Sequence, residues 1–222
     1  MAAGNVKSIF VSHMEDECMI EIAKVEADST ESTKIHDLSN IQSATSTRPS
    51  LHLLSDRKSH REICVPLQKV ALNGDIEAAI RLLEMDASVV CAAITEGCET
   101  ILHVATGARQ TKFLAKKVKL MKPEHLTLQD ENGNTALCFA AAVGAVQIAE
   151  IVLDKNPSLL MIRGCKNMTP LYVGSLFGRK EMTSFLYYKS RKELTADDRK
   201  FIFFTSINTG LYGKLTYISR KI

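Results

Sequence analysis

The stretch NGNTALCFAAAVGAVQIAEIVL, residues 132–153, decides the fold of this chain. Within it, residues 136–149 contain no charged side chain. A membrane-spanning helix needs about 20 apolar residues, and Glu150 ends the uncharged run before that length is reached. The turn sequence NGN opens the stretch, and Gly144 divides the apolar part in two. This pattern predicts two short helices in succession, not a membrane span or a core strand.

The same pattern recurs through residues 61–222. Blocks that align with it without gaps are VPLQKVALNGD at 65–75, TILHVATGARQ at 100–110, TALCFAAAVGA at 135–145 and TPLYVGSLFGR at 169–179. One column of this alignment holds leucines that are 35, 35 and 34 residues apart, namely Leu67, Leu102, Leu137 and Leu171. A weaker fifth block, IFFTSINTGLYGKLTYI at 202–218, places Gly210 thirty-two residues after Gly178. A fixed period of this length indicates a repeat array.

Each unit of the array is expected to contain two helices. The first begins at Thr or a β-branched residue, followed by Pro or a small residue that suits a helix start. Glycine ends this helix, because it adopts left-handed backbone readily. Second apolar runs then start at Ile76, Phe113, Val146 and Met182. A helix pair this small cannot bury its own apolar face, so we expect it to stack against its neighbours.

These blocks resemble the ankyrin repeat, which has a period near 33 residues and the signature T-P-L-H-x-A. TILHVA at 100–105 and TPLYVG at 169–174 match that signature closely, and DENGNTALCFAAAVGA at 130–145 follows the whole turn-and-helix pattern. The resemblance implies an all-α solenoid of stacked helix-turn-helix units with β-turn or hairpin connections, serving as a protein-binding scaffold. The units are expected near 64–96, 97–131, 132–165 and 166–198, with a partial fifth at 199–222.

Three segments of the sequence are similar, more narrowly, to plant ankyrin proteins in which a cytosolic array precedes a C-terminal membrane domain. The segments concerned are KPEHLTLQDENGNTAL at 122–137, NPSLLMIRGCKNMTPL at 156–171 and INTGLYGKL at 207–215. The membrane domain is absent from this sequence. The resemblance implies a cytoplasmic location, at the cytosolic face of the plasma membrane, and a role in signalling, stress response or defence.

The chain departs from the ankyrin signature at several positions. Gln68, Cys138 and Tyr172 stand where the family prefers His. The resemblance therefore implies that only His103 makes the hydrogen bonds between repeats that this histidine usually supplies. Arg109 replaces the glycine that ends the first helix in the other blocks.

The last block stops before a second helix is complete. A terminal repeat ordinarily presents a polar outer face, whereas the apolar residues here are Phe201, Phe203, Phe204 and Ile207. We expect a chain that is truncated, spliced short or dependent on a partner, with partner binding or self-association at this open C-terminal repeat.

Residues 1–60 differ in composition from the array. They carry 6 Lys and Arg against 9 Asp and Glu, and residues 29–50 contain ten Ser or Thr. Such a segment cannot bury enough apolar surface to offset its ordering entropy. We therefore expect a largely disordered N-terminal region. Ser12 and Glu15 have capping-box spacing, which predicts a short helix at 12–27.

The sequence offers no support for catalysis. Its six cysteines form no C-x-x-C pair, which indicates free thiols, and its six histidines lie outside any metal-ligand motif. Phosphate-binding loops and the G-x-S-x-G nucleophile turn are missing. The net charge of +3 lacks the dense basic stripe of a nucleic-acid-binding protein. We expect a protein that is not an enzyme, has no cofactor and no metal, and binds no nucleic acid.

The sharpest charged feature is KFLAKKVKLMK at 112–122. It interleaves apolar residues with Lys112, Lys116, Lys117, Lys119 and Lys122. One interpretation is a basic surface that docks on anionic lipid, with possible peripheral membrane association. The other is the solvated side of a second helix, and this is the interpretation we favour.

Partner binding is expected on one concave face, where the turn tips and the exposed side of each first helix do not pack between repeats. Helices about 10 Å wide, stacked in four repeats, give a strip about 40 Å long, which suits a protein partner better than a small molecule. The residues placed at or near this face are Leu72, Asn73, Glu99, Glu131, Asn132, Asn134, Val143, Lys166, Met168, Leu176 and Phe177.

Overall fold

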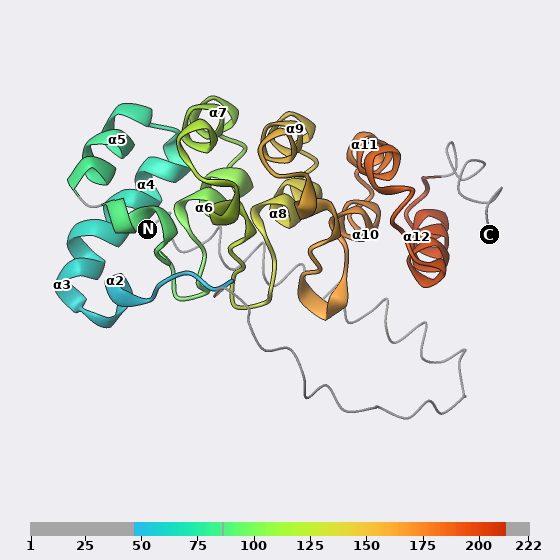
Figure 1. Ribbon diagram of the computed structural model, residues 1–222, viewed down its shortest axis with the longest axis horizontal. Helices are drawn as coiled ribbons and strands as arrows, with labels where there is room; N and C mark the ends of the chain where they lie inside the picture. Colours follow the sequence, from blue (N-terminus) through green and yellow to red (C-terminus); the bar gives the residue numbers. More distant parts are fainter. Residues whose placement is uncertain (1–46, 86, 212–222) are drawn as a thin grey trace. The chain divides into compact units, whose positions relative to one another are not determined.

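The computed structural model describes residues 47–85 and 87–211, and these residues form a row of helix pairs (Figure 1). The first helices of the pairs lie side by side in one layer: α4 (Val65–Asn73), α6 (Ile101–Gly107), α8 (Ala136–Val143), α10 (Pro170–Leu176) and α12 (Ala196–Asn208). A second layer covers one side of them: α5 (Ile76–Met85), α7 (Thr111–Leu120), α9 (Val146–Lys155) and α11 (Lys180–Ser190). The predicted helix-turn-helix solenoid is confirmed.

Short 3-10 helices lie in the connections between pairs. They are η2 (Ala87–Cys91), η3 (Pro123–Thr127), η4 (Pro157–Met161) and η5 (Cys165–Asn167). The connections are hydrogen-bonded turns, and within the described residues the only β-pairing is an isolated bridge between Ser50 and Ala92. No helix in the described part of the chain is long and apolar enough to cross a membrane.

The leucines that recur at a regular spacing lie in the core of the array. Leu67, Leu102, Leu137 and Leu171 are each at most 1% exposed. Every residue of α8 is buried, because α6 and α10 flank it on either side and α9 covers it. The first eight residues of the uncharged run, 136–143, are therefore the interior of a stacked unit.

Left-handed residues end the first helices, as the sequence predicts. Gly74, Gly144, Gly178 and Gly210 all have φ between 62° and 73°. Arg109 occupies the same position with φ 57°, a conformation that costs a non-glycine residue free energy. Its guanidinium donates to the carbonyl of Val143 in the next pair, so the side chain offsets part of that cost.

The helical body begins earlier than the boundary at residue 60. Residues 52–60, assigned from composition to the disordered region, include α2 (His52–Ser55) and α3 (Arg57–Ser59). A π-helical turn, η1 (His60–Cys64), joins α3 to α4. Leu53 and Cys64 are buried, so these short helices close the first unit with little apolar sequence. The helix predicted at 12–27 lies outside the described residues.

Candidate protein-binding surface

The turn before α8 is held in shape by several hydrogen bonds around Asp130. The Asp130 carboxylate accepts from the backbone N–H groups of Asn132 at 3.0 Å and Asn134 at 2.7 Å. Backbone bonds from Asp130 N to Asn134 O and from Gly133 N to Asp130 O, at 2.9 and 3.1 Å, close the loop. Burial raises the pKa of Asp130, although these bonds favour its charged form. The carboxylate is thus committed to shaping the turn.

His103 joins this turn to the preceding repeat. Its Nδ1 accepts from the Thr100 backbone N–H at 3.2 Å, so Nε2 carries the proton and donates to the Asn134 carbonyl at 3.2 Å. The ring packs edge-on against Phe139, with centroids 5.2 Å apart. Burial lowers the pKa of His103 to about 4, with hydrogen bonds to backbone carbonyls opposing the shift. The imidazole is therefore neutral and structural at physiological pH.

Gln68 makes a related bond within the first unit. Gln68 stands at the equivalent position of the first unit, and its Nε2 donates to the Ile94 carbonyl of the following connection. A glutamine amide has a donor at the end of a side chain of similar length to histidine. It anchors the connection that leads to α6, and the expectation that only His103 joins one repeat to the next stays a prediction.

Consecutive turns are also bonded directly to one another. The Glu131 backbone N–H donates to the Gly97 carbonyl at 3.0 Å, and the Cys165 N–H donates to Asn134 Oδ1 at 3.0 Å. These bonds tie the turn tips into one continuous edge. The exposed side chains on that edge are Glu96, Glu131, Lys166 and Asn167.

The structure separates the predicted binding residues by exposure. Asn73, Glu131 and Lys166 are exposed, whereas Leu72, Asn132 and Phe177 are half-buried. The remaining members are buried: Glu99, Asn134, Val143, Met168 and Leu176. Asn134 in particular uses its backbone and side chain to bond α6, its own turn and the next turn. Buried residues of this kind shape the surface but cannot supply its main contacts.

The basic segment 112–122 lies mainly on α7. Lys112, Lys116, Lys119 and Lys122 are exposed. Lys117 is only 8% exposed, because it follows Phe113 and Leu114 by four and three residues and so lies on the inward face of the helix. Burial lowers the pKa of Lys117 to about 8, and nearby Cys91 opposes the shift. Its inclusion in a lipid-facing basic surface is therefore wrong.

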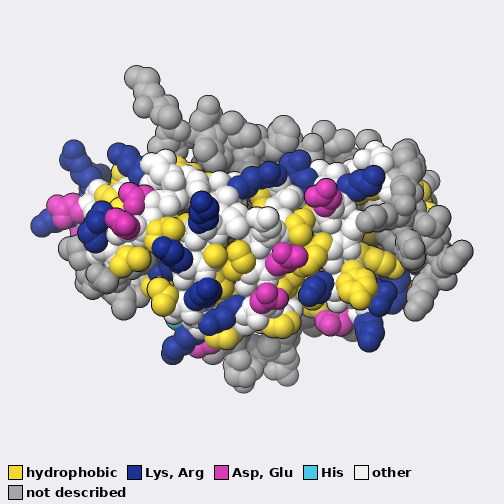
Figure 2. All heavy atoms as spheres, turned by 90° about the horizontal axis from the view of Figure 1, so that it is seen from above, with side chains coloured by type: hydrophobic (Ala, Val, Ile, Leu, Met, Phe, Trp, Pro, Cys, Tyr) yellow, Lys and Arg dark blue, Asp and Glu magenta, His cyan; other side chains and the backbone are white. Residues whose placement is uncertain are grey.

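Figure 2 looks onto the outer helices and shows how their charges are distributed. Lysines and arginines are scattered among acidic and hydrophobic side chains there, and they do not merge into one basic patch. Leu120, at the end of α7, is nevertheless 79% exposed between Lys119 and Lys122.

The last helix is attached through an ion pair. Arg163 binds Asp198 with both guanidinium branches, each at 2.9 Å. Burial raises the pKa of Asp198, but hydrogen bonds from Arg163 and Thr195 outweigh it, so the pKa lies below its usual range. Beyond this contact, Phe201 and Phe204 of α12 are 47% and 60% exposed, and Phe203 and Ile207 are half-buried.

The described residues show neither a cysteine thiol with a lowered pKa nor a cluster of metal-ligand side chains. Burial raises the pKa of the Cys64, Cys91, Cys98 and Cys138 thiols, which disfavours the reactive thiolate. Within the same part of the chain, no group of three or more His, Cys, Asp or Glu side chains is arranged to hold a metal ion.

One comparison with known protein families identifies the units. A family model described as "Ankyrin repeats (3 copies)" matches residues 108–198. The match begins at the turn that follows α6 and ends within α12.

Proposed function

Because this chain carries three ankyrin repeats over residues 108–198, we propose that it is a non-catalytic scaffold that binds a partner protein along the edge of its turn tips. Repeat arrays of this kind present extended concave surfaces, and these accept proteins more readily than small molecules. The partner contacts the exposed tips and the adjoining sides of the first helices.

The bonded edge of turn tips is the observation that carries this proposal. Hydrogen bonds from Glu131 N to Gly97 O and from Cys165 N to Asn134 Oδ1 join three consecutive turns, so the tips there need little ordering when a partner binds. Binding surfaces that are already ordered lose less entropy on association. Exposed charges of both signs, Glu131 and Lys166, lie on neighbouring tips, and such a pattern favours one register of the partner.

A charge-reversal variant tests the proposal. Glu131→Lys combined with Lys166→Glu changes two exposed tips and leaves the buried bonds of the turns in place. In affinity capture with the full chain, this double variant should no longer recover the protein partners that the wild type recovers. Glu150→Lys combined with Lys180→Glu makes the same exchange on exposed positions of the outer helices and should keep them. Equal recovery of partners by both variants would contradict the proposal.

The setting of this scaffold is a further part of the proposal. The similarity of three of its sequence segments to plant ankyrin proteins supports a cytoplasmic role in signalling, stress response or defence. In that setting the array holds a partner at the cytosolic face of the plasma membrane. Fractionation of plant cells that express the full chain with a C-terminal tag would place it, and recovery only from an organelle lumen would contradict this part.

The exposure of Leu120 favours a second candidate function, docking on an anionic membrane surface. An apolar side chain that is 79% exposed among lysines can enter the interface between lipid headgroups and acyl chains. Flotation with vesicles of mixed phosphatidylserine and phosphatidylcholine tests it, with Lys116→Gln and Lys119→Gln as the disabling changes. The exposed pair Lys189→Gln and Lys192→Gln is the control. Flotation that is absent, or equally strong in both variants, would remove this candidate.

A further inference from the structure

A hollow of about 800 Å³ lies at the N-terminal end of the described array, in a part of the chain that precedes the family match. Its walls come from the segment that joins α2, α3, η1 and α4, and from Glu96 at the tip of the first turn. Leu54 and Val65 contribute apolar surface to it. The volume is within the usual range of about 300–1,000 Å³ for binding sites.

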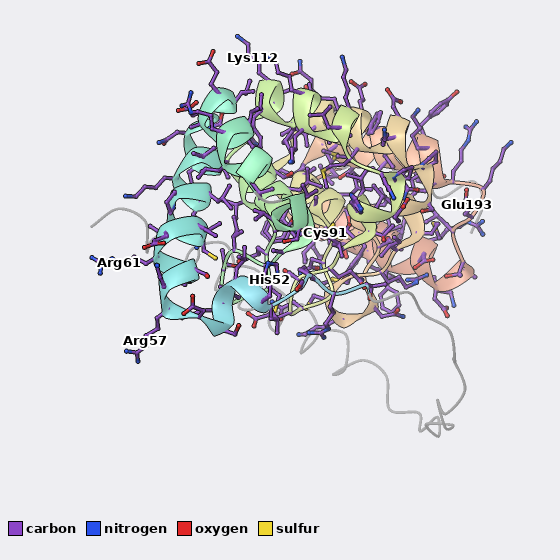
Figure 3. All side chains as sticks on the ribbon, turned by 60° about the vertical axis from the view of Figure 1, so that its left-hand side comes forward. His52, Arg57, Arg61, Cys91, Lys112 and Glu193 are labelled. Carbon is purple, nitrogen blue, oxygen red and sulfur yellow. The ribbon has the colours of Figure 1, made fainter. Side chains whose placement is uncertain are left out.

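Charged side chains of both signs line this hollow, with three cations and two carboxylates. Arg57, Lys58 and Arg61 line it and are exposed, and the exposed acidic residues of the same helical segment are Glu62 and Asp56, which caps α3. Figure 3 shows Arg57 and Arg61 projecting on the same side of this end of the array. Within the described residues, none of the three cations forms an ion pair within 4 Å, although hydrogen bonds from Ser59 and Lys58, and after them the charge of Lys58, lower the pKa of Asp56.

The backbone under these cations has an uncommon form. Between α3 and α4 the chain makes a π-helical turn at His60–Cys64, with the Val65 N–H bonded to the His60 carbonyl. Single π-turns inside α-helices are rare and occur frequently at functional sites. Here the turn lies where His60, Arg61 and Glu62 face the hollow.

We propose that this hollow binds an acidic peptide segment of the partner protein. The inference rests on the proposed scaffold function and names the chemistry of the partner. Carboxylates of the segment pair with Arg57, Lys58 and Arg61, and an apolar side chain between them packs against Leu54 and Val65.

A carboxylate-rich peptide fits this site better than a membrane does. Guanidinium groups bind carboxylates through two parallel hydrogen bonds, which gives a directional contact that lysine lacks. A lipid surface is flat, whereas these cations surround a hollow with apolar walls. Glu62 and Glu96 keep the net charge of the lining residues low, so binding depends on placing each carboxylate against a cation.

The test uses the full chain and two fluorescein-labelled peptides of about ten residues. In one, glutamates flank two central leucines, and in the other every glutamate is replaced by glutamine. Fluorescence anisotropy should show that only the glutamate peptide binds, with an affinity that falls as salt is added. Arg57→Gln combined with Arg61→Gln should weaken it at least about tenfold, while Glu62→Gln should tighten it by a factor of about two. Lys180→Gln combined with Lys192→Gln, exposed at the other end of the array, is the control.

Each outcome decides the proposal. Equal binding of the two peptides, no binding of either, or equal loss in the arginine and control variants would overturn it. Anionic vesicles that bind through Arg57 and Arg61 when the glutamate peptide does not would also overturn it, in favour of a lipid. If the peptide fails but the Glu131 and Lys166 variant still loses captured partners, only this inference falls. If that variant keeps its partners as well, the scaffold function falls with it.

Discussion

His103 Nε2 donates a hydrogen bond to the backbone carbonyl of Asn134, 3.2 Å away and 31 residues later in the sequence. Both groups are buried, so neither finds a water partner if the other is lost. An unsatisfied buried polar group costs about 1–3 kcal/mol. This single contact therefore couples the stability of α6 to that of the turn before α8.

Replacing His103 should destabilise the array. We expect His103→Ala to lower the free energy of unfolding by about 2–4 kcal/mol, because it leaves the Asn134 carbonyl unpaired and opens a cavity beside Phe139. His103→Gln should lower the free energy of unfolding by less, since the Gln68 amide makes a comparable hydrogen bond to a backbone carbonyl within the first unit. Urea denaturation followed by circular dichroism measures both. Equal losses in the two variants would contradict a role for the donor.

Acid should destabilise the protein through the same histidine. The folded pKa of His103 is about 4, whereas unfolded histidine titrates near 6.5. Between these values the unfolded chain binds more protons, so stability falls as pH drops from about 6.5 to about 4. The loss from this group is on the order of 3 kcal/mol at pH 4. Urea midpoints measured across this range should fall more steeply for the wild type than for His103→Gln, and parallel curves would contradict the assignment.

Gly164→Ala should disrupt the bond between two turns. A Cβ at this position would collide with Asn134 Oδ1, which is held by the Cys165 N–H. We expect a loss of about 1–3 kcal/mol in unfolding free energy. Gly107→Ala is the matched control, because its Cβ would lie 3.8 Å from the nearest atom, in Phe139, and α6 is helical there. That change should be neutral or stabilising by up to about 1 kcal/mol. Thermal unfolding measures both variants, and a melting temperature for Gly164→Ala equal to or above that of Gly107→Ala would contradict the prediction.

Arg163→Ala should loosen the last helix. It removes two charge-assisted hydrogen bonds to Asp198, each at 2.9 Å, and we expect a local loss of about 1.5–3 kcal/mol. Hydrogen exchange of amides in α12 should become faster, while α8 is unaffected. Lys200→Ala breaks only an exposed 3.8 Å pair with Asp197 and should change little. Unchanged exchange in α12 would mean that apolar packing alone holds the helix.

Lys117→Met should stabilise the array at neutral pH. The lysine is buried and its pKa lowered to about 8, so at pH 7 the protein keeps a poorly hydrated charge. Methionine fills similar space without that cost. Lys116→Met, on the exposed side of the same helix, should alter stability by no more than about 0.5 kcal/mol. A lower melting temperature for Lys117→Met would show that the ammonium has a partner it needs.

The sequence predicts the array well because its signal is repeated. Burial of Leu67 and its counterparts follows from a period that recurs in every unit, and the helix ends follow from glycines at fixed spacing. Residues 52–60 could not be recognised in this way. They occur once, are mostly polar, and become helical only because Leu53 and Cys64 are covered by the first unit.

The surface was harder to predict than the fold for a related reason. Residue type suggested that Lys117 is exposed, but its position along the helix buries it. The hollow beside Arg57 and Arg61 combines residues from the N-terminal helices with Glu96, more than 30 positions later, and no motif connects them. Its π-turn also has no sequence signature that we recognise.

The bonded turn edge has a mechanical consequence. Neighbouring turns are joined by backbone hydrogen bonds such as Glu131 N to Gly97 O, whereas the outer helices α7 and α9 meet through side chains, including a 3.4 Å bond from Lys155 Nζ to the Lys119 carbonyl. Contacts of long exposed side chains give way more easily than bonds donated by the backbone of the turns, which here are Glu131 N to Gly97 O and Cys165 N to Asn134 Oδ1. When the array flexes, we therefore expect the turn edge to act as the hinge line and the outer helices to spread. The spacing between the tips stays constant as the curvature changes, so a bound partner would measure the same distances throughout.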